Sequence, residues 1–191
     1  MPIPVDQILD AKGLACPMPM VKTKKAMEAL LPGRVLEVQA TDKGSIADIQ
    51  SWAAKVGHAY LGTRVDAEVI FHYLRKASPI EVKPETKHPI TVTNDELLQK
   101  LEREGNDIVL IDVREPAEYA FGHIPGALSV PLGTLEETMK TFDLSLNIYV
   151  ICRTGNRSDL AAQLLSNQGF TKVTNIIPGM SQWTAPVNRE E

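Results

Sequence analysis

The first 76 residues alternate short apolar runs with stretches in which apolar residues recur at helical spacing. After Cys16, the side chains of Met20, Met27 and Leu31 fall on one face of a helix, with lysines on the opposite face. Pro32 and the glycine after it end this helix. The order strand, helix, strand, helix, strand, strand predicts a βαβαββ two-layer sandwich with both helices on one face of the sheet. The predicted elements lie at residues 8–11, 20–31, 35–40, 45–57, 59–68 and 69–75.

The second helix of this half has both of its ends marked in the sequence. Ser45, with Asp48 three residues later, resembles a capping box, and Gly57 is typical of a helix end. Between them, Ile49 and Ala53 keep helical spacing. We therefore expect the Ser45 side chain to cap this helix.

Strand and helix patterns alternate in the second half, which is typical of a parallel sheet covered by helices on both faces. Thr93 and Glu96 form a capping-box pair before a helix that we expect to end at Gly105, and residues 159–168 predict another helix. The fold class is therefore α/β in both halves, with a three-layer arrangement around a central parallel sheet in the second. Continuous apolar runs predict strands at 108–111, 148–151 and 173–177.

The stretch 77–89 separates the two halves. It contains three prolines among mostly polar residues, which is typical of a linker. We therefore predict an N-terminal domain over residues 1–77, a linker over 78–89 and a C-terminal domain over 90–191.

Length and composition fit two small globular domains. The chain has 191 residues, of which 43% are hydrophobic and 23% are charged. Its apolar runs fall well short of the ~18 residues that a membrane helix needs. The N-terminal residues lack the basic and apolar segments of a signal peptide. We therefore expect a cytoplasmic protein with no membrane partner.

The charge of the chain is unevenly distributed. A net charge of −4 argues against nucleic acid as a direct ligand, because phosphates require a basic surface. Residues 1–77 carry ten lysines and arginines against eight aspartates and glutamates, a net +2, whereas residues 78–191 carry −6. Such opposite charges favour a weak, salt-screened attraction between the domains.

The chain contains two cysteines, Cys16 and Cys152. Cytoplasmic reductants keep thiols reduced, so we do not expect a structural disulfide. A buried cysteine often serves only as a small apolar side chain. Cys152, however, directly follows the predicted strand 148–151, and ligands of open parallel sheets bind beyond the carboxyl ends of their strands. This position favours a functional cysteine.

The loop after Cys152 has the residue types of an anion cradle. Gly155 and Asn156 tolerate unusual backbone angles, so amide N–H groups can converge there beside the positive end of the next helix. Such donors favour a thiolate, the nucleophilic form of cysteine. Arg153 and Arg157 add charge for an oxyanion substrate, although Arg157 could instead pair with a buried carboxylate. We therefore predict Cys152 as the nucleophile. The substrate-binding candidates are Arg153, Thr154, Gly155, Asn156 and Arg157.

Residues 90–185 resemble a single-domain rhodanese, which is a sulfurtransferase. Near its end, Pro178 stands where the family usually has glycine, so the resemblance does not fix the local shape of that loop. The motifs that carry the resemblance lie at 112–115, 118–119, 122–127, 152–158 and 178–183.

The rhodanese resemblance implies a mechanism and roles for several residues. The Cys152 thiolate attacks the outer sulfur of thiosulfate or another donor, becomes a persulfide and passes that sulfur to a thiol. We expect no metal and no cofactor besides this transient cysteine persulfide. Asp112, Arg114 and His123 are expected to brace the fold. Phosphatases of the same fold have five residues between cysteine and arginine, whereas four separate Cys152 from Arg157; this smaller cradle favours sulfur.

Cys16 directly precedes the first predicted helix and is followed by Pro17 and Pro19. Proline suits the first turn of a helix, because its φ angle is already helical and it has no N–H group to leave unsatisfied. A cysteine at a helix N-terminus is again in a position that favours the thiolate.

Residues 6–76 resemble a TusA/SirA-type sulfur carrier. The resemblance implies a βαβαββ sandwich that holds a persulfide on Cys16. The turn at 43–45 departs from the family, which usually has a more acidic or proline-containing sequence there, and this bears on the choice of partner. The motifs are Gly13–Pro19 around the cysteine, Pro32-Gly33, Asp42 and Asp48-Ile49.

Together these features predict a sulfurtransferase of the rhodanese type joined to its carrier. The second domain acquires sulfur on Cys152, and the first domain receives it on Cys16 and delivers it to a thiol acceptor. The expected partners are small donors such as thiosulfate, and a cysteine desulfurase or other sulfur-carrier proteins. Two alternatives remain open: a persulfide sensor or scaffold with little turnover, and an oxyanion reductase or phosphatase that uses the same fold.

Overall fold

The computed structural model describes residues 3–78, 87–104 and 107–190. The chain divides into two compact units, Met1–Pro79 and Ile80–Glu191. Most of the linker expected over 78–89 lies outside the described residues. Within the described ranges, the helices are too short or too polar to cross a membrane.

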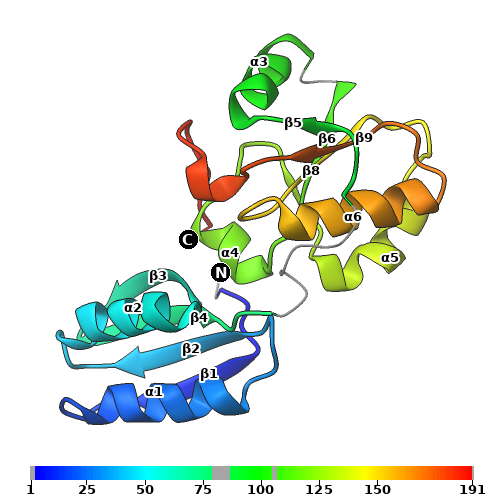
Figure 1. Cartoon of the computed structure of the whole chain (residues 1–191). Helices are drawn as coiled ribbons and strands as arrows, with labels where there is room; N and C mark the ends of the chain where they lie inside the picture. Colours follow the sequence, from blue (N-terminus) through cyan, green and yellow to red (C-terminus); the bar gives the residue numbers. More distant parts are fainter. Residues whose placement is uncertain (1–2, 79–86, 105–106, 191) are drawn as a thin grey trace. The chain divides into compact units, whose positions relative to one another are not determined.

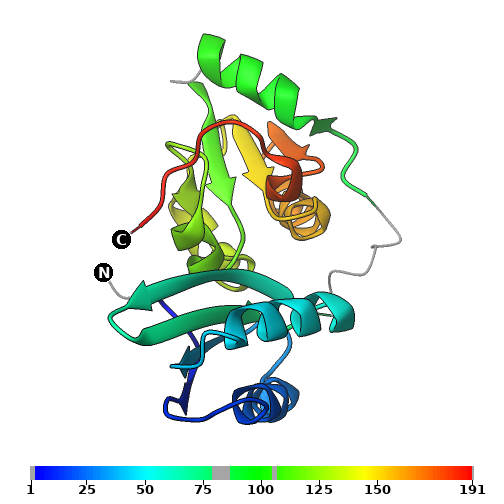
Figure 2. The ribbon, with the colours of Figure 1, turned by 90° about the vertical axis from the view of Figure 1, so that its left-hand side faces the viewer.

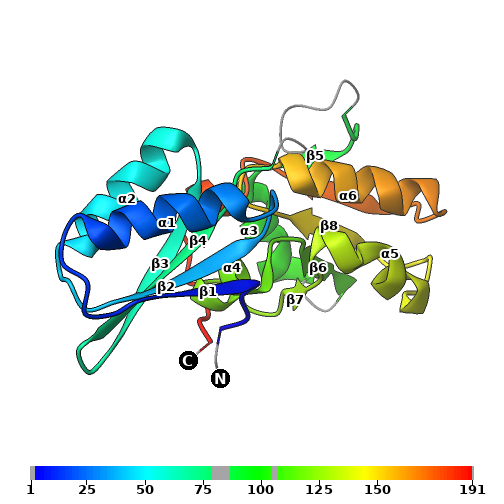
Figure 3. The same cartoon turned by 90° about the horizontal axis from the view of Figure 1, so that it is seen from below.

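The first unit is a sheet covered by helices on one face. Its strands follow the order β1-β2-β4-β3, with β1 parallel to β2 and the other neighbours antiparallel. Helices α1 and α2 lie side by side on one face of this sheet (Figure 3). The predicted βαβαββ sandwich is confirmed. Its elements are β1 (Gln7–Ala11), α1 (Met18–Ala29), β2 (Val35–Ala40), α2 (Ser45–Val56), β3 (Ala59–Asp66) and β4 (Val69–Arg75).

The core of the first unit lies between the helices and the sheet. Met27 of α1 and Ile49 of α2 pack with Leu36 and Val38 of β2, and all four side chains are essentially excluded from solvent. The expectation for Leu31 is wrong: α1 ends at Ala29, the chain becomes extended, and the Leu31 side chain is 67% exposed.

The expected capping box of α2 is also wrong. The N-cap is Gly44, and no side chain caps this helix end. The Ser45 hydroxyl instead donates a hydrogen bond to the backbone oxygen of Asp42 at 2.5 Å, and it is also hydrogen-bonded to the buried ring of His72. The other end follows expectation, because Gly57 closes α2 in the left-handed region with φ of +80°.

The second unit is built on a parallel sheet. Its strands follow the order β5-β9-β8-β6-β7, and all neighbouring pairs are parallel. Figure 1 labels β5, β6, β8 and β9 of this sheet. The described strands and helices are β5 (Thr91–Val92), α3 (Asn94–Glu104), β6 (Val109–Asp112), α4 (Pro116–Phe121), β7 (Leu128–Ser129), α5 (Leu135–Thr138), β8 (Ile148–Ile151), α6 (Asn156–Asn167) and β9 (Val173–Ile176). Single 3₁₀ turns lie at η3 (Leu132–Thr134), η4 (Met139–Thr141) and η5 (Met180–Gln182).

Helical layers cover both faces of this second sheet. Leu135 of α5 and Leu165 of α6 pack on one face of the strands, whereas Leu97 of α3 packs on the other. Figure 2 shows α3 (green) and α6 (orange) on different sides of the strands. The predicted α/β class, with a central parallel sheet in three layers, is confirmed.

The structure confirms the predicted start of α3 and moves the predicted start of α6. The capping box of α3 is confirmed, since the Thr93 amide donates to Glu96 Oε2 at 2.8 Å and the Glu96 amide donates to Thr93 Oγ1 at 3.2 Å. The expected stop at Gly105 lies outside the described residues. Helix α6 begins at Asn156, three positions before the predicted start.

Candidate functional site

Cys152 lies directly after β8, at the carboxyl end of the parallel sheet. Its side chain is only 1% exposed. The Sγ atom accepts a hydrogen bond from the backbone N–H of Gly155 at 3.2 Å and from Ser158 Oγ at 3.3 Å. Both donors face the sulfur with a partial positive charge, so they stabilise an anionic sulfur at this position.

The shape of the Cys152 loop depends on Gly155. This residue is the N-cap of α6 and has φ of +89°, a region that L side chains rarely adopt. A Cβ atom added there would lie 2.4 Å from Ile177 Cγ2. The carbonyl of Gly155 also accepts a hydrogen bond from Asn175 Nδ2 at 3.2 Å. The left-handed backbone of Gly155, its close approach to Ile177 and the hydrogen bond to its carbonyl hold the loop in this shape. In this shape the Gly155 N–H points at the sulfur of Cys152.

A second loop closes against the backbone of the cysteine. The amide of Met180 donates to the Cys152 carbonyl at 2.9 Å, and the amide of Ser181 donates to the Arg153 carbonyl at 2.8 Å. Gly179 makes this approach possible, because a Cβ atom there would lie 2.4 Å from the Cys152 oxygen. Pro178 replaces the first glycine of the family pattern, but Gly179, the residue that this contact requires, is present.

Arg157 makes a buried ion pair with Glu118 of α4. Its Nη1 donates to Glu118 Oε2 at 2.7 Å and its Nη2 donates to Glu118 Oε1 at 2.9 Å, with side chains only 5% and 3% exposed. The alternative reading of Arg157, as the partner of a buried carboxylate, matches this geometry. A substrate contact by Arg157 remains a prediction. The pair joins the first turn of α6 to α4 and thereby fixes the helix end beside Cys152.

The other candidates of this loop lie nearer to solvent. Arg153 and Thr154 have exposed side chains, and Asn156 is partly buried in the first turn of α6. Their substrate-binding roles remain predictions. Ser158 and Glu118 belong to the rhodanese motifs at 152–158 and 118–119, but the sequence pattern predicted no role for either of them. An α6 start at 156 would have pointed to Ser158, because it puts the hydroxyl within the first helical turn, beside the cysteine loop.

Contacts of three further motif residues brace the second unit. Arg114 binds Asp112 through Nε at 2.9 Å and through Nη2 at 2.6 Å, and donates to the Gly122 carbonyl at 2.7 Å. The ring of His123 stacks on Tyr119 with 3.7 Å between ring centroids. These contacts hold the turn between α4 and β7 and involve no atom of Cys152.

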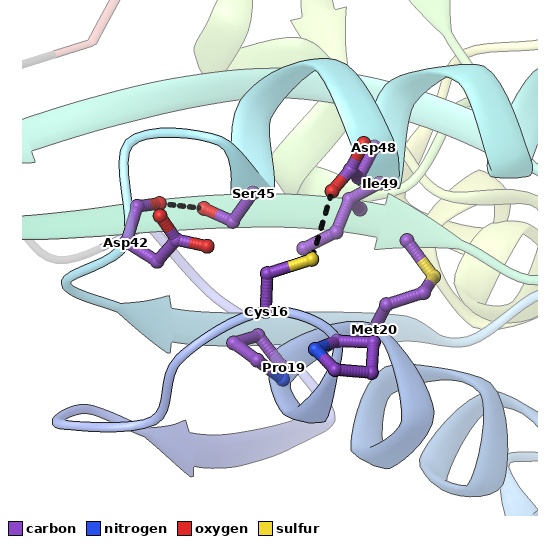
Figure 4. Close-up of a pocket in the computed structure, with 8 residues that line it drawn as sticks. Cys16, Pro19, Met20, Asp42, Ser45, Asp48 and Ile49 are labelled. Carbon is purple, nitrogen blue, oxygen red and sulfur yellow. Dashed lines mark hydrogen bonds between the residues drawn. The ribbon is translucent and has the colours of Figure 1, made fainter.

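Cys16 lies at the edge of a small pocket in the first unit (Figure 4). The residue is exposed, and its Sγ donates a hydrogen bond to Asp48 Oδ2 at 3.9 Å. The pocket lies between the start of α1 and the start of α2. On the α1 side it is lined by Pro17, the N-cap, and Pro19, in the first turn of this helix. The lining residues are Cys16, Pro17, Pro19, Met20, Asp42, Ser45, Asp48 and Ile49.

A buried hydrogen-bond chain lies behind this pocket. Ser45 has a single hydroxyl hydrogen, which it donates to the Asp42 carbonyl, so His72 Nε2 must donate to Ser45 Oγ at 2.9 Å. His72 Nδ1 then accepts from the Tyr60 hydroxyl at 2.8 Å. Burial of the ring lowers the pKa of His72 to about 4. His72 is therefore neutral at physiological pH and holds the turn that carries Asp42.

The two cysteines thus have hydrogen-bond environments of opposite sense. Cys152 accepts hydrogen bonds, whereas Cys16 donates one to a carboxylate. Within the part of the chain that the structure describes, no cluster of three or more histidine, cysteine, aspartate or glutamate residues could hold a metal ion. The chemistry that these sites offer is that of nucleophilic sulfur.

Comparison with known families identifies both units. Residues 7–76 match the family described as Sulfurtransferase TusA, and residues 93–186 match the family described as Rhodanese-like domain. The first match covers the sheet of the first unit and includes Cys16; the second covers β6 to β9 of the second unit and includes Cys152.

Individual relatives match one unit or the whole chain. A Bacillus subtilis protein named "Putative sulfur carrier protein YrkF" is 46% identical over 177 residues, covering 93% of this chain and 95% of that protein. The "Sulfur carrier protein TusA" of Allochromatium vinosum is 41% identical over 73 residues, covering 38% of this chain and 95% of its own length. The crystal structure of a rhodanese-like domain protein from Staphylococcus aureus has a TM-score of 0.50 and 29% identity, covering 53% of this chain and 99% of that one.

Proposed function

This chain belongs to the family of sulfur carrier proteins in which a TusA domain precedes a rhodanese-like domain, and we propose that it relays sulfur from Cys152 to Cys16. Sulfur carriage and sulfur transfer are the functions of that family. The proposal adds the donor, the order of the cysteines and the acceptor.

The first step loads Cys152. Its thiolate attacks the outer sulfur of thiosulfate, the S–S bond of thiosulfate breaks, and sulfite leaves with the bonding electron pair. The product is the persulfide anion of Cys152, so charge and atoms balance. A persulfide of a cysteine desulfurase or a small thiol can replace thiosulfate, with the donor thiolate leaving in place of sulfite.

The second step moves the outer sulfur to Cys16. The sulfur of Cys16 attacks the outer sulfur of the Cys152 persulfide and gives up its own proton to a base. The S–S bond of the Cys152 persulfide breaks, and the Cys152 thiolate leaves with the bonding pair. The N–H of Gly155 and the hydroxyl of Ser158 support this step, because they stabilise the departing thiolate. Cys16 is exposed and can then present the persulfide to the thiol of an acceptor, such as another sulfur-carrier protein.

A reducing compartment such as the cytoplasm suits this chemistry. Both thiols must be free at the start of each cycle, and cytoplasmic reductants keep them so. Any acceptor must bring its own thiol to the exposed pocket of Cys16.

The observation that carries the proposal is the pair of donors aimed at Cys152 Sγ. The test measures sulfite release from thiosulfate, with cyanide as the final acceptor, in the native chain and in Cys152→Ser and Cys16→Ser. We expect Cys152→Ser to lose turnover and Cys16→Ser to keep the release of one sulfite per chain. Undiminished turnover in Cys152→Ser contradicts the proposal.

The same assay separates an enzyme from a persulfide sensor. An enzyme releases sulfite continuously while a thiol or cyanide removes the sulfur. A sensor releases about one sulfite per chain and then stops, even with the acceptor in excess.

A further inference from the structure

The Cys16 pocket contains a proton acceptor in contact with the sulfur. Asp48, in the first turn of α2, points its carboxylate at Cys16 (Figure 4), and Oδ2 accepts the thiol hydrogen bond at 3.9 Å. An acidic residue in the first turn also favours a helix through the helix dipole. That effect needs no contact with a thiol, however, whereas this carboxylate is the hydrogen-bond partner of the sulfur.

The remaining charge in this pocket does not compensate for Asp48. Among the described residues that line it, the charged side chains are Asp42 and Asp48, both acidic. The neighbours from α1 and its N-cap are Pro17, Pro19 and Met20, which carry no charge. The described lining therefore offers the Cys16 sulfur an acceptor for its proton, the Asp48 carboxylate, and no cation.

We propose that Asp48 is the catalytic proton acceptor for Cys16 when Cys16 takes up sulfur. This proposal rests on the proposed sulfur-carrier function. In the step, Cys16 Sγ forms a bond to the outer sulfur of the donor persulfide while its proton moves to Asp48 Oδ2. The S–S bond of the donor breaks, and the donor sulfur leaves with the bonding pair. The products are the Cys16 persulfide, the protonated Asp48 carboxyl and the donor thiolate, so atoms and charge balance.

The two sites then favour one direction of transfer. Hydrogen-bond donors at Cys152 stabilise a leaving thiolate, and an acceptor at Cys16 removes the proton from an attacking thiol. For delivery, the thiolate of the acceptor attacks the outer sulfur of the Cys16 persulfide. The S–S bond of the Cys16 persulfide then breaks. The departing Cys16 sulfur takes a proton from the Asp48 carboxyl, or from water if Asp48 has already lost its proton.

The test isolates the loading of Cys16 from the relay. In the full chain with Cys152→Ser, glutathione persulfide serves as the donor, and intact mass spectrometry follows the rate at which one sulfur is added to Cys16. Rates are measured between pH 6 and pH 9, with and without Asp48→Asn. The ratio of the two rates cancels the ionisation of the donor.

We expect Asp48→Asn to load at one-tenth of the native rate or less at pH 6, within the range that general base catalysis supplies, roughly 10²-fold or more at its full extent. The ratio should rise toward one at pH 9, because bases in solution can then remove the proton without the Asp48 carboxylate. Asp48→Glu keeps a carboxylate and should recover most of the rate. Asp66→Asn, a change of the same charge at an exposed position at the end of β3, should load at the native rate.

Two outcomes overturn the assignment. If Asp48 acts only by repelling a thiolate, then Asp48→Asn loads faster than the native chain at pH 6. If Asp48 only shapes the pocket, the rate falls by the same factor at every pH, and the melting temperature of the variant falls with it. Because Cys152 takes no part in this assay, failure of the relay from Cys152 does not affect its result.

Discussion

The ion pair between Arg157 and Glu118 makes the sharpest energetic prediction for the second unit. Replacing Glu118 with Gln keeps the shape of the side chain but removes the carboxylate charge that faces the buried Arg157 guanidinium. Removal of one partner from a buried pair costs about 3–5 kcal/mol. Since the amide oxygen can still accept one of the two hydrogen bonds, we expect the free energy of unfolding to fall by about 3 kcal/mol, the lower end of this range.

Urea unfolding measures this loss in the intact chain. The sequence contains two tryptophans, Trp52 in α2 and Trp183 in the second unit. A Trp52→Phe background therefore lets tryptophan fluorescence report the second unit alone. With a slope of about 1–3 kcal/mol per molar urea, a loss of about 3 kcal/mol shifts the midpoint by ~1–3 M. Glu136→Gln, at an exposed position in α5, is the matched control and should change stability by less than about 0.5 kcal/mol.

A double variant then separates stability from substrate binding. Replacing both Glu118 and Arg157 with leucine removes both charges, and such replacements are often neutral for stability. We expect the double variant to be more stable than Glu118→Gln and still to load Cys152 from thiosulfate. A loss below about 1 kcal/mol in Glu118→Gln would refute the view that this pair holds the end of α6. Loss of Cys152 loading in a stable double variant would assign Arg157 to the substrate.

Three further predictions concern both units. Gly155→Ala should destabilise the second unit by at least ~2 kcal/mol in urea unfolding, because the new Cβ atom meets both φ of +89° and a clash with Ile177. The control Gly126→Ala has φ of +81° but open space, so it should cost only ~1 kcal/mol. Equal losses in the two variants would rule out the clash. Ser158→Ala removes one donor from Cys152 and should slow its loading by thiosulfate about tenfold, the equivalent of roughly 1.4 kcal/mol; an unchanged rate would remove Ser158 from the site. The pKa of His72 is about 4 when folded and 6.5 when unfolded, so its contribution is complete above pH 6.5 and is lost as pH falls toward 4. Urea unfolding of the first unit should show about 2 kcal/mol less stability at pH 5 than at pH 7 from this group, and His72→Gln should abolish that difference.

The order of elements could be predicted from the sequence because its signals are local. The run Ile148–Ile151 is apolar throughout, and all of its side chains are buried in β8. Gly57 ends α2 because glycine adopts the left-handed conformation without steric cost. Such features depend on a few neighbouring residues and need no knowledge of the tertiary fold.

The errors arose where distant residues decide. Ser45 has the sequence of a capping residue, yet its hydroxyl is held by His72, 27 positions later in the chain. Leu30 and Leu31 are equally apolar, and only the position at which the chain leaves α1 decides that Leu30 is 7% exposed and Leu31 is 67% exposed. Periodicity alone does not give that position.

The site of Cys152 shows how the position of a helix boundary decides which side chains meet. The helix was expected from 159, which placed Arg157 in a loop facing a substrate. Because α6 begins at Asn156, Arg157 lies in its first turn and its guanidinium meets Glu118 from a different helix. The same early start brings the hydroxyl of Ser158 to the sulfur of Cys152. No pattern within the loop reveals Glu118, which lies 39 positions earlier in the chain.

The relay from Cys152 to Cys16 is tested most directly by locating the sulfur. The native chain and Cys152→Ser are loaded with thiosulfate, and mass spectrometry of their peptides follows the added sulfur on each cysteine over time and at several protein concentrations. The account predicts that Cys152 is labelled first, that Cys16 follows at a rate independent of protein concentration, and that Cys16 stays unlabelled in Cys152→Ser. A Cys16 rate proportional to protein concentration would show transfer between molecules. Equal labelling of Cys16 without Cys152, or no labelling of Cys16 at all, would contradict the relay.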